Sequence, residues 1–168
     1  MRVLSIILLI SLFISSCKQA DNLAFVNQYG REDFSAFRNT TFFVRGYDSQ
    51  HNIILFASDD FENTHRNGLV IMTVDPATFA VNQFDFKLIR HRDSSEVDQQ
   101  KLRHLARRFM NFPIWRLDVD RNDNVFVRLQ EGDKPALARF SDAKYITTAG
   151  KFQSNWKQLK GNWYVAAL

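Results

Sequence analysis

Acidic and amide side chains alternate through one short stretch of this chain in a pattern that could hold a cation. The stretch contains Asp118, Asp120, Asn122 and Asn124. Their spacing matches the first oxygen ligands of a calcium-binding loop, but Asp123 stands where that loop needs glycine and Leu129 where it needs glutamate. A β-hairpin turn explains the same residues, since Asn and Asp favour turns. We therefore expect no metal ion or cofactor, and Asp118, Asp120 and Asn122 are the ligands to test with calcium.

A second acidic cluster consists of Asp59, Asp60 and Glu62, in a polar part of the chain. Two carboxylates held at the right separation can hydrolyse a glycosidic bond, so this cluster, or Asp118 with Asp120, could serve a small hydrolase. A surface loop is the favoured interpretation of this cluster. The sequence has no nucleophile elbow, phosphate-binding glycine loop, paired-histidine metalloprotease motif or dinucleotide-binding fingerprint. The sequence therefore favours binding over catalysis.

Basic side chains gather on a helix that we expect over residues 95–111. Arg103 and Arg107, and likewise His104 and Arg108, lie one helical turn apart, which places them on a basic face beside the apolar one. This face could bind an anionic polymer or lipid headgroups, whereas nucleic acid is not expected at a net charge of only +4. The competing interpretation is a solvated face whose bases complement the helix dipole. The four histidines are scattered, without the close pair typical of zinc sites.

The only cysteine follows a leader in which a charged, an apolar and a small-residue segment succeed one another. The apolar run, residues 3–14, is shorter than the ~20 residues that a membrane-spanning helix needs. The order Ile14-Ser15-Ser16-Cys17 resembles the lipobox of bacterial lipoproteins, whose cysteine is acylated. The resemblance implies cleavage after residue 16 and acyl chains, such as palmitate, on Cys17. Each buried methylene contributes ~0.8 kcal/mol, so several chains anchor the protein permanently in a membrane.

The lipobox resemblance also bears on location and charge. The residue after the cysteine is Lys18 and not aspartate, which favours the outer membrane and leaves open whether the protein faces the periplasm or the exterior. Removal of Arg2 with the leader lowers the formal charge from +4 to +3. A lone cysteine excludes an internal disulfide.

Three segments are expected along the chain: a signal peptide over residues 1–16, a lipidated tether over residues 17–22, and one globular domain over residues 23–168. The domain contains no Gly/Ser-rich or Pro-rich linker and no convincing internal repeat. A mature chain of about 150 residues can bury roughly two thirds of its unfolded surface, which is enough for a single core.

Short runs of β-branched and aromatic residues, separated by turn residues, predict four β-hairpins. The paired runs are residues 41–47 with 53–57, 69–74 with 81–89, 115–120 with 125–130, and 156–159 with 162–165. In the second hairpin, Phe84, Phe86 and Leu88 alternate with polar residues, so we expect these three on a buried face. Consecutive hairpins indicate antiparallel pairing, because parallel strands need a crossover each time.

The expected helix over residues 95–111 has start signals and an apolar face. Asp93 with Glu96, or Ser95 with Asp98, can form its capping box. Its apolar face would consist of Leu102, Leu105, Ala106 and Phe109. These elements predict an α+β fold, in which an antiparallel, hairpin-rich sheet packs against this helix. The alternative is an all-β fold with a helical insertion.

Aromatic residues are frequent, with sixteen phenylalanines, and most must be buried. Residues 23–38 could form a short helix that contributes several of them to the core. Aromatics left exposed would mark a partner or ligand site, which we expect first at the C-terminal edge, residues 162–165. The sequence thus predicts a lipid-anchored cell-envelope protein with a non-catalytic binding or assembly role, whose partner is another envelope protein or an anionic polymer. A hydrolase of envelope polymers and a structural subunit of an envelope complex are the alternatives.

Overall fold

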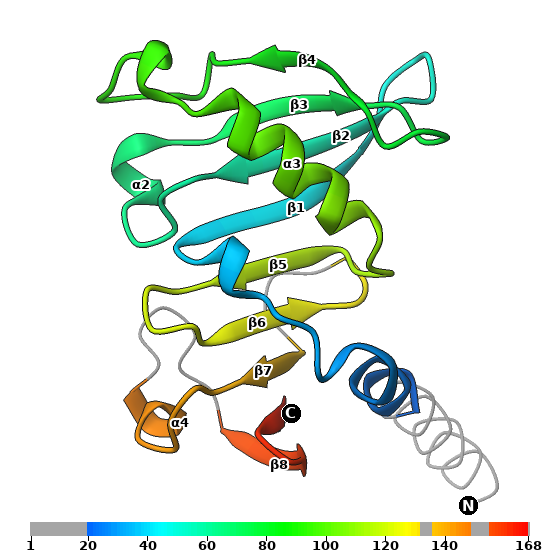
Figure 1. The fold of residues 1–168 in the computed structure, drawn as a ribbon, viewed down its shortest axis with the longest axis vertical. Coiled ribbons are helices and arrows are strands. Elements are labelled where there is room, and N and C mark those ends of the chain that lie inside the picture. Colours follow the sequence, from blue (N-terminus) through cyan, green and yellow to red (C-terminus); the bar gives the residue numbers. More distant parts are fainter. Residues whose placement is uncertain (1–19, 132–135, 149–154, 168) are drawn as a thin grey trace, which may run out of the picture.

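The computed structural model of the chain describes residues 20–131, 136–148 and 155–167. Within them, nine strands form one sheet in the order β4-β3-β2-β1-β5-β6-β7-β9-β8, with every neighbouring pair antiparallel (Figure 1). Short helices accompany this sheet, so the fold is mixed and dominated by antiparallel strands. No described helix is both long and apolar enough to cross a membrane. Cys17 and the expected leader lie outside the described residues.

Short strands make up the sheet. They are β1 (Thr40–Tyr47), β2 (Ile53–Ser58), β3 (Val70–Val74), β4 (Val81–Asp85), β5 (Arg116–Val119), β6 (Val125–Arg128), β7 (Leu137–Arg139), β8 (Trp156–Lys160) and β9 (Trp163–Ala166). The helices with described bounds are η1 (Ser35–Phe37), α2 (Thr64–Asn67), η2 (Ser94–Glu96), α3 (Gln99–Met110) and α4 (Tyr145–Thr148). Residues 20–29 are also helical, so the described part of the stretch expected as a tether, residues 20–22, belongs to a helix.

Two meanders meet in the middle of the sheet, where β1 pairs with β5. Strands β1 to β4 follow one another outward to one edge. Helix α3 then carries the chain back across the sheet to β5, as Figure 1 shows. From β5 the chain continues through β6 and β7, and the β8–β9 hairpin completes the other edge with β9 beside β7.

All four predicted hairpins are confirmed. Strand β4 is shorter than predicted because it ends at Asp85, whose carboxylate accepts a hydrogen bond of 2.9 Å from the backbone nitrogen of Lys87 and turns the chain. The expectation that Leu88 belongs to a buried strand face is therefore wrong, and this side chain is 39% exposed. Strand β7 and the short helices α2 and α4 were not predicted.

Helix α3 packs its predicted apolar face against the sheet, and Leu102, Leu105, Ala106 and Phe109 are all buried. Its start differs from the expected capping boxes, since Asp98 is the N-cap and accepts from the backbone nitrogen of Lys101 at 2.8 Å. Asp93 caps the separate one-turn helix η2 instead. The residues beneath α3 on β1–β3, such as Phe42, Leu55 and Met72, are fully buried.

The C-terminal half of the sheet is covered by the N-terminal part of the chain. Phe25 from helical residues 20–29 and Phe34 pack their rings against Trp163 at 6.0 and 6.4 Å. The indole nitrogen of Trp163 donates to the carbonyl of Gly30 at 3.1 Å, and the side chain is 2% exposed. The expectation of exposed aromatics at residues 162–165 is therefore wrong for Trp163, which a segment from the N-terminal part of the chain buries, and Tyr164 is half-buried.

Candidate functional site

The acidic residues of the predicted cation-binding stretch bond within their own hairpin. One carboxylate oxygen of Asp120 accepts from the backbone nitrogens of Asn122 and Asn124 at 2.8 and 2.9 Å. Its other oxygen accepts from the side-chain amide of Asn124 at 2.8 Å. These bonds make Asp120 the cap of the β5–β6 turn. Among the described residues, no group of three or more His, Cys, Asp or Glu side chains could hold a metal ion.

Asp118 lies on β5, 1% exposed, with its carboxylate bound by charged and polar neighbours. Arg116 donates to it through Nε at 2.6 Å and Nη2 at 2.8 Å, and the Thr41 hydroxyl on β1 also donates to it. Such a two-point bond to a guanidinium is among the strongest that a carboxylate makes. Asp118 therefore ties β5 to β1 and is not available as a hydrolytic acid.

Asp60 is the centre of a network of amide side chains between β2 and α2. Asn39, Asn63 and Asn67 donate to its carboxylate at 3.0, 3.0 and 2.8 Å. Burial alone would raise the pKa of Asp60, but the hydrogen bonds from Asn63 and Asn39 outweigh burial and hold this pKa below its usual value. A carboxyl group with a lowered pKa stays ionised near neutrality and cannot act as a general acid.

The neighbouring acid, Asp59, forms an ion pair with Arg92 from the segment that follows β4. Both side chains are largely buried, with 12% and 16% of their surfaces exposed. The acidic cluster of the β2–α2 segment thus fixes that segment in place. Neither of its aspartates has the free carboxylate that the hydrolase alternative requires.

The basic face predicted on α3 is divided between packing and solvent. Arg103 donates to the carbonyl of Val81 on β4 and lies 4.6 Å above the ring of Phe84. Arg108 donates to the carbonyl of Asp33 at 3.1 Å. Arg103, His104 and Arg107 are exposed, and Arg108 is half-buried. Two of the four predicted anion-binding residues therefore bind the protein's own backbone.

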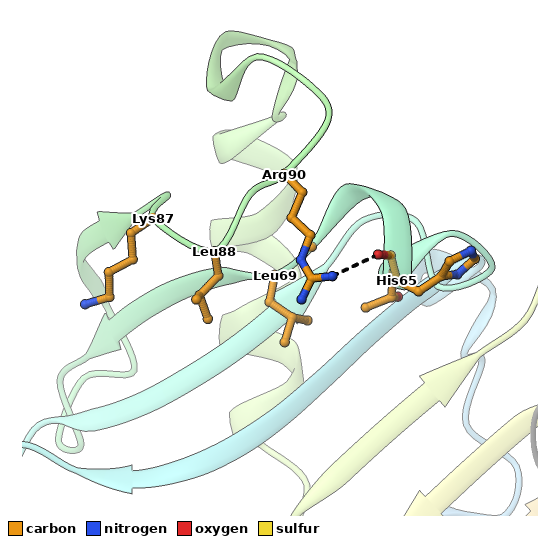
Figure 2. A pocket seen from close by; sticks show the side chains of 7 residues that line it. His65, Leu69, Lys87, Leu88 and Arg90 are labelled. Carbon is orange, nitrogen blue, oxygen red and sulfur yellow. Dashed lines mark hydrogen bonds between the residues drawn. The ribbon is translucent and has the colours of Figure 1, made fainter.

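An open cavity of about 380 Å³ lies beside α2, where residues 64–69 approach residues 87–90 (Figure 2). Its lining comprises Thr64, His65, Gly68, Leu69, Lys87, Leu88 and Arg90. Three of these side chains are basic and none is acidic. Figure 2 shows the guanidinium of Arg90 turned toward His65, whose backbone carbonyl accepts its hydrogen bond of 3.3 Å.

The close approach of the two cavity walls depends on Gly68. This residue has φ +81° and ψ −161°, a conformation open essentially to glycine alone. A Cβ atom on it would lie 1.9 Å from the carbonyl oxygen of Leu88. Backbone bonds of 3.3 Å from Leu69 to Leu88 and from Arg90 to Asn67 join the walls. The cavity is therefore preformed, and sequence reasoning missed it because its walls come from separate segments.

The face of β1–β4 opposite α3 carries apolar side chains. Phe43 on β1 pairs with Phe56 on β2, which pairs with Ile71 on β3, and the two phenylalanine rings lie 5.3 Å apart. Ile54 lies two residues before Phe56 and so on the same face. All four are half-buried. Among the described helices, α3 is the one that crosses these strands, on their other face (Figure 1).

No protein-family model matches the chain, and comparison with the curated proteins and with the solved structures finds no match.

Proposed function

We propose that this chain is a lipid-anchored protein of the bacterial cell envelope whose α+β domain binds another envelope protein without performing chemistry. The binding surface is the face of β1–β4 opposite α3. The supporting observation is the composition of β2 and β3, which read Ile-Ile-Leu-Phe-Ala-Ser and Val-Ile-Met-Thr-Val. Strands with one wet face alternate apolar and polar residues, whereas near-continuous apolar strands are typical of sheets covered on both faces. A partner protein would bury the face of β1–β4 that α3 does not cover.

The partner that fits this surface is apolar at its centre and acidic at its rim. The contiguous row of Phe43, Phe56 and Ile71 offers aromatic and aliphatic side chains, which dominate the energetics of protein interfaces. Arg45 is exposed at the irregularity of β1, where the pairing shifts between Val44 and Gly46. A carboxylate on the partner opposite Arg45 would favour the correct orientation of the complex.

The proposed anchor would favour this complex by holding the domain at the membrane that also contains its partner. Cys17 precedes the first described helical residue, Ala20, by three positions. Three extended residues span at most about 11 Å, so acyl chains on Cys17 hold the domain close to the lipid headgroups. Confinement to the same membrane raises the effective concentration of partner and domain. Lys18, the residue after the cysteine, favours the outer membrane as the membrane that holds the anchor.

Metabolic labelling with a palmitate analogue tests the anchor. We expect label on the wild-type protein and none on Cys17→Ser, because a serine hydroxyl cannot form the thioether to the lipid. Label that persists on Cys17→Ser would contradict the anchor.

Charge substitution on the sheet face tests the binding surface. Ile54→Lys places a cation in the proposed apolar interface, whereas His104→Lys adds a cation on the exposed side of α3. We expect the partner to dissociate from the anchored Ile54→Lys variant and to remain with His104→Lys, with melting temperatures confirming that both variants fold. Retention of the same partner by both variants would contradict the proposal.

The hydrolase alternative is not favoured by the geometry, because Asp59, Asp60 and Asp118 all bind neighbouring side chains. A structural subunit of an envelope complex would use the same sheet face as a binding protein. The stability of the complex separates these two roles, since a structural subunit stays bound through purification whereas a transient partner dissociates on dilution.

A further inference from the structure

We infer that the face of the sheet covered by α3 lies toward an anionic membrane surface, with the exposed side of α3 against the lipid headgroups. This inference rests on the lipid anchor of the proposed function and adds the orientation of the anchored domain. The supporting observations are the position of helical residues 20–29 beside α3, the charge of α3, and further cations on the same side.

Helical residues 20–29 and α3 cover the same face of the sheet. Cross-strand pairing runs from Phe42, beneath α3, through β5, β6 and β7 to Val165 on β9, so these positions share one face. Trp163 lies two residues before Val165 and therefore on that face as well. The ring of Phe25, from the N-terminal helical segment, packs against Trp163. Both helical segments thus lie on one side of the domain.

The proposed anchor lies on this side. Helical residues 20–29 end close to the C-terminal end of α3, since the rings of Tyr29 and Phe112 lie 5.4 Å apart and Phe112 follows α3 by two residues. Cys17 precedes Ala20 by three positions, and three extended residues span at most about 11 Å. Acyl chains on Cys17 would therefore bring the bilayer to the helix-covered side of the domain.

Helix α3 carries cations and no acid, as its sequence Gln-Gln-Lys-Leu-Arg-His-Leu-Ala-Arg-Arg-Phe-Met shows. Lys101, Arg103 and Arg107 are exposed, and Arg108 is half-buried. None of these four forms an ion pair with a described residue, and the carbonyls that accept from Arg103 and Arg108 do not neutralise them. Like charges one helical turn apart repel, as Arg103 and Arg107 do. An anionic surface would relieve this repulsion.

Strand β8 adds cations to the same side of the domain. Lys157 pairs with Val165 and Lys160 with Trp163, which places both exposed lysines on the helix-covered face. Lys160 also donates to the side-chain oxygen of Asn27 at 2.6 Å, so the β8–β9 hairpin lies next to the N-terminal helical segment. Exposed acids in the N-terminal segment and at the start of α3 are fewer, namely Asp21, Glu32, Asp33 and Asp98. Positive charge is therefore in excess on this side.

An anionic bilayer is the partner that the anchor would bring within reach of these cations. Each lysine or arginine close to such a surface strengthens the attraction about fivefold, and salt weakens it. With α3 against the headgroups, the apolar face of β1–β4 points away from the bilayer, because the two faces of a sheet are opposite. This orientation leaves the proposed protein-binding surface accessible.

Fluorescence quenching by nitroxide-labelled headgroups tests the orientation of the acylated protein in vesicles of phosphatidylethanolamine and phosphatidylglycerol. A fluorophore is attached to Gln100→Cys on α3 or to Gln83→Cys on β4, because acylation would occupy the thiol of Cys17, the only native cysteine. Gln83 pairs with Thr73, which pairs with Ile54, so it lies on the opposite face. We expect at least twofold stronger quenching at position 100, and no difference in vesicles of phosphatidylcholine alone.

A charge substitution tests the role of α3 in this orientation. Arg107→Gln should lower the ratio of docked to undocked domain about fivefold. Arg66→Gln removes the same charge from an exposed position on α2 and should change this ratio by less than about twofold. Both substitutions alter exposed side chains, and melting temperatures confirm that the variants fold.

Three results would overturn the inference. They are equal quenching at positions 83 and 100, quenching that does not depend on phosphatidylglycerol, and equal effects of Arg107→Gln and Arg66→Gln. Failure of the anchor is a separate outcome, since it would appear as palmitate label that persists on Cys17→Ser. A protein that carries its label on Cys17 but is quenched equally at both positions would contradict the orientation alone.

Discussion

The side-chain amide of Asn124 donates a hydrogen bond of 2.8 Å to Asp120. The same bond joins Asn52 to Asp48 at 3.0 Å in the other meander. In both turns the backbone nitrogen of the aspartate donates to the backbone carbonyl of the asparagine at 3.0 Å. The residue before the asparagine has a positive φ, 61° at Asp123 and 65° at His51. One turn geometry therefore closes the two hairpins that meet at the centre of the sheet.

The two turns should differ in their importance for stability. Asn124 is fully buried and its side-chain amide oxygen also accepts from the backbone nitrogen of Ser141 at 2.9 Å, whereas Asn52 is half-buried. Asp120→Ala leaves a buried amide without its acceptor, which costs about 1–3 kcal/mol of unfolding free energy. Asp48→Ala should cost less, because water can replace the carboxylate. Urea unfolding measures both variants, and equal losses would contradict this account of the turns.

Gly68→Ala should destabilise the protein strongly. The new Cβ atom would lie 1.9 Å from the Leu88 carbonyl oxygen, and the backbone conformation is itself strained for alanine by about 1–3 kcal/mol. Gly161→Ala is the matched control, because Gly161 has φ +57° and no atom within 4 Å of the new Cβ. Thermal unfolding should show a larger decrease in melting temperature for Gly68→Ala. A larger decrease for Gly161→Ala would mean that the cavity walls are not held together at Gly68.

The lowered pKa of Asp60 predicts a dependence of stability on pH. Because the folded state binds the proton more weakly than the unfolded state, whose carboxyl has a pKa near ~3.9, the stabilisation is complete above that value. It is lost as the pH falls through the lower, folded pKa. Asp60→Asn should therefore show a shallower loss of stability below pH ~4 than the wild type.

A control for the pH prediction is Asp142→Asn. The pKa of Asp142 is also lowered, chiefly by the hydrogen bond from the backbone of Lys144, but this carboxylate is exposed and its described hydrogen bond and ion pair are both with Lys144. Chemical unfolding at a series of pH values measures how the free energy of unfolding depends on pH. This dependence should become shallower in Asp60→Asn than in Asp142→Asn. Identical acid profiles of the wild type and Asp60→Asn would show that the amide network does not stabilise the folded state.

Arg103 and Arg107 should respond differently to the same substitution. Arg103→Gln removes a charged hydrogen bond to Val81 and the contact with the Phe84 ring, which at this exposed position together contribute about 1 kcal/mol. Arg107→Gln removes an exposed charge and should change the unfolding free energy by less than ~0.5 kcal/mol. Urea unfolding of the two variants makes the comparison, and a larger effect at Arg107 would contradict the assignment of Arg103 to packing.

Local turn chemistry explains which elements could be predicted from the sequence. The Asp and Asn residues at 48–52 and 120–124 indicate hairpins, and the structure contains both. Strand β7 has only three residues, too few for an alternating pattern to be recognised. The burial of Trp163 depends on Gly30, 133 positions earlier, and no local pattern carries such a contact. The cavity was missed for the same reason, since its two walls meet only in the folded chain.

Site-specific photo-crosslinking in the anchored protein tests the proposed function most directly. A photoreactive residue at position 54 or 71 would lie on the proposed interface, and one at position 100 or 104 would lie on the exposed side of α3. We predict one shared crosslinked partner from positions 54 and 71, no product from positions 100 and 104, and loss of the product when Phe56→Lys is added. Crosslinking only from α3, or equal crosslinking from both surfaces, would contradict the assignment of this sheet face as the binding surface.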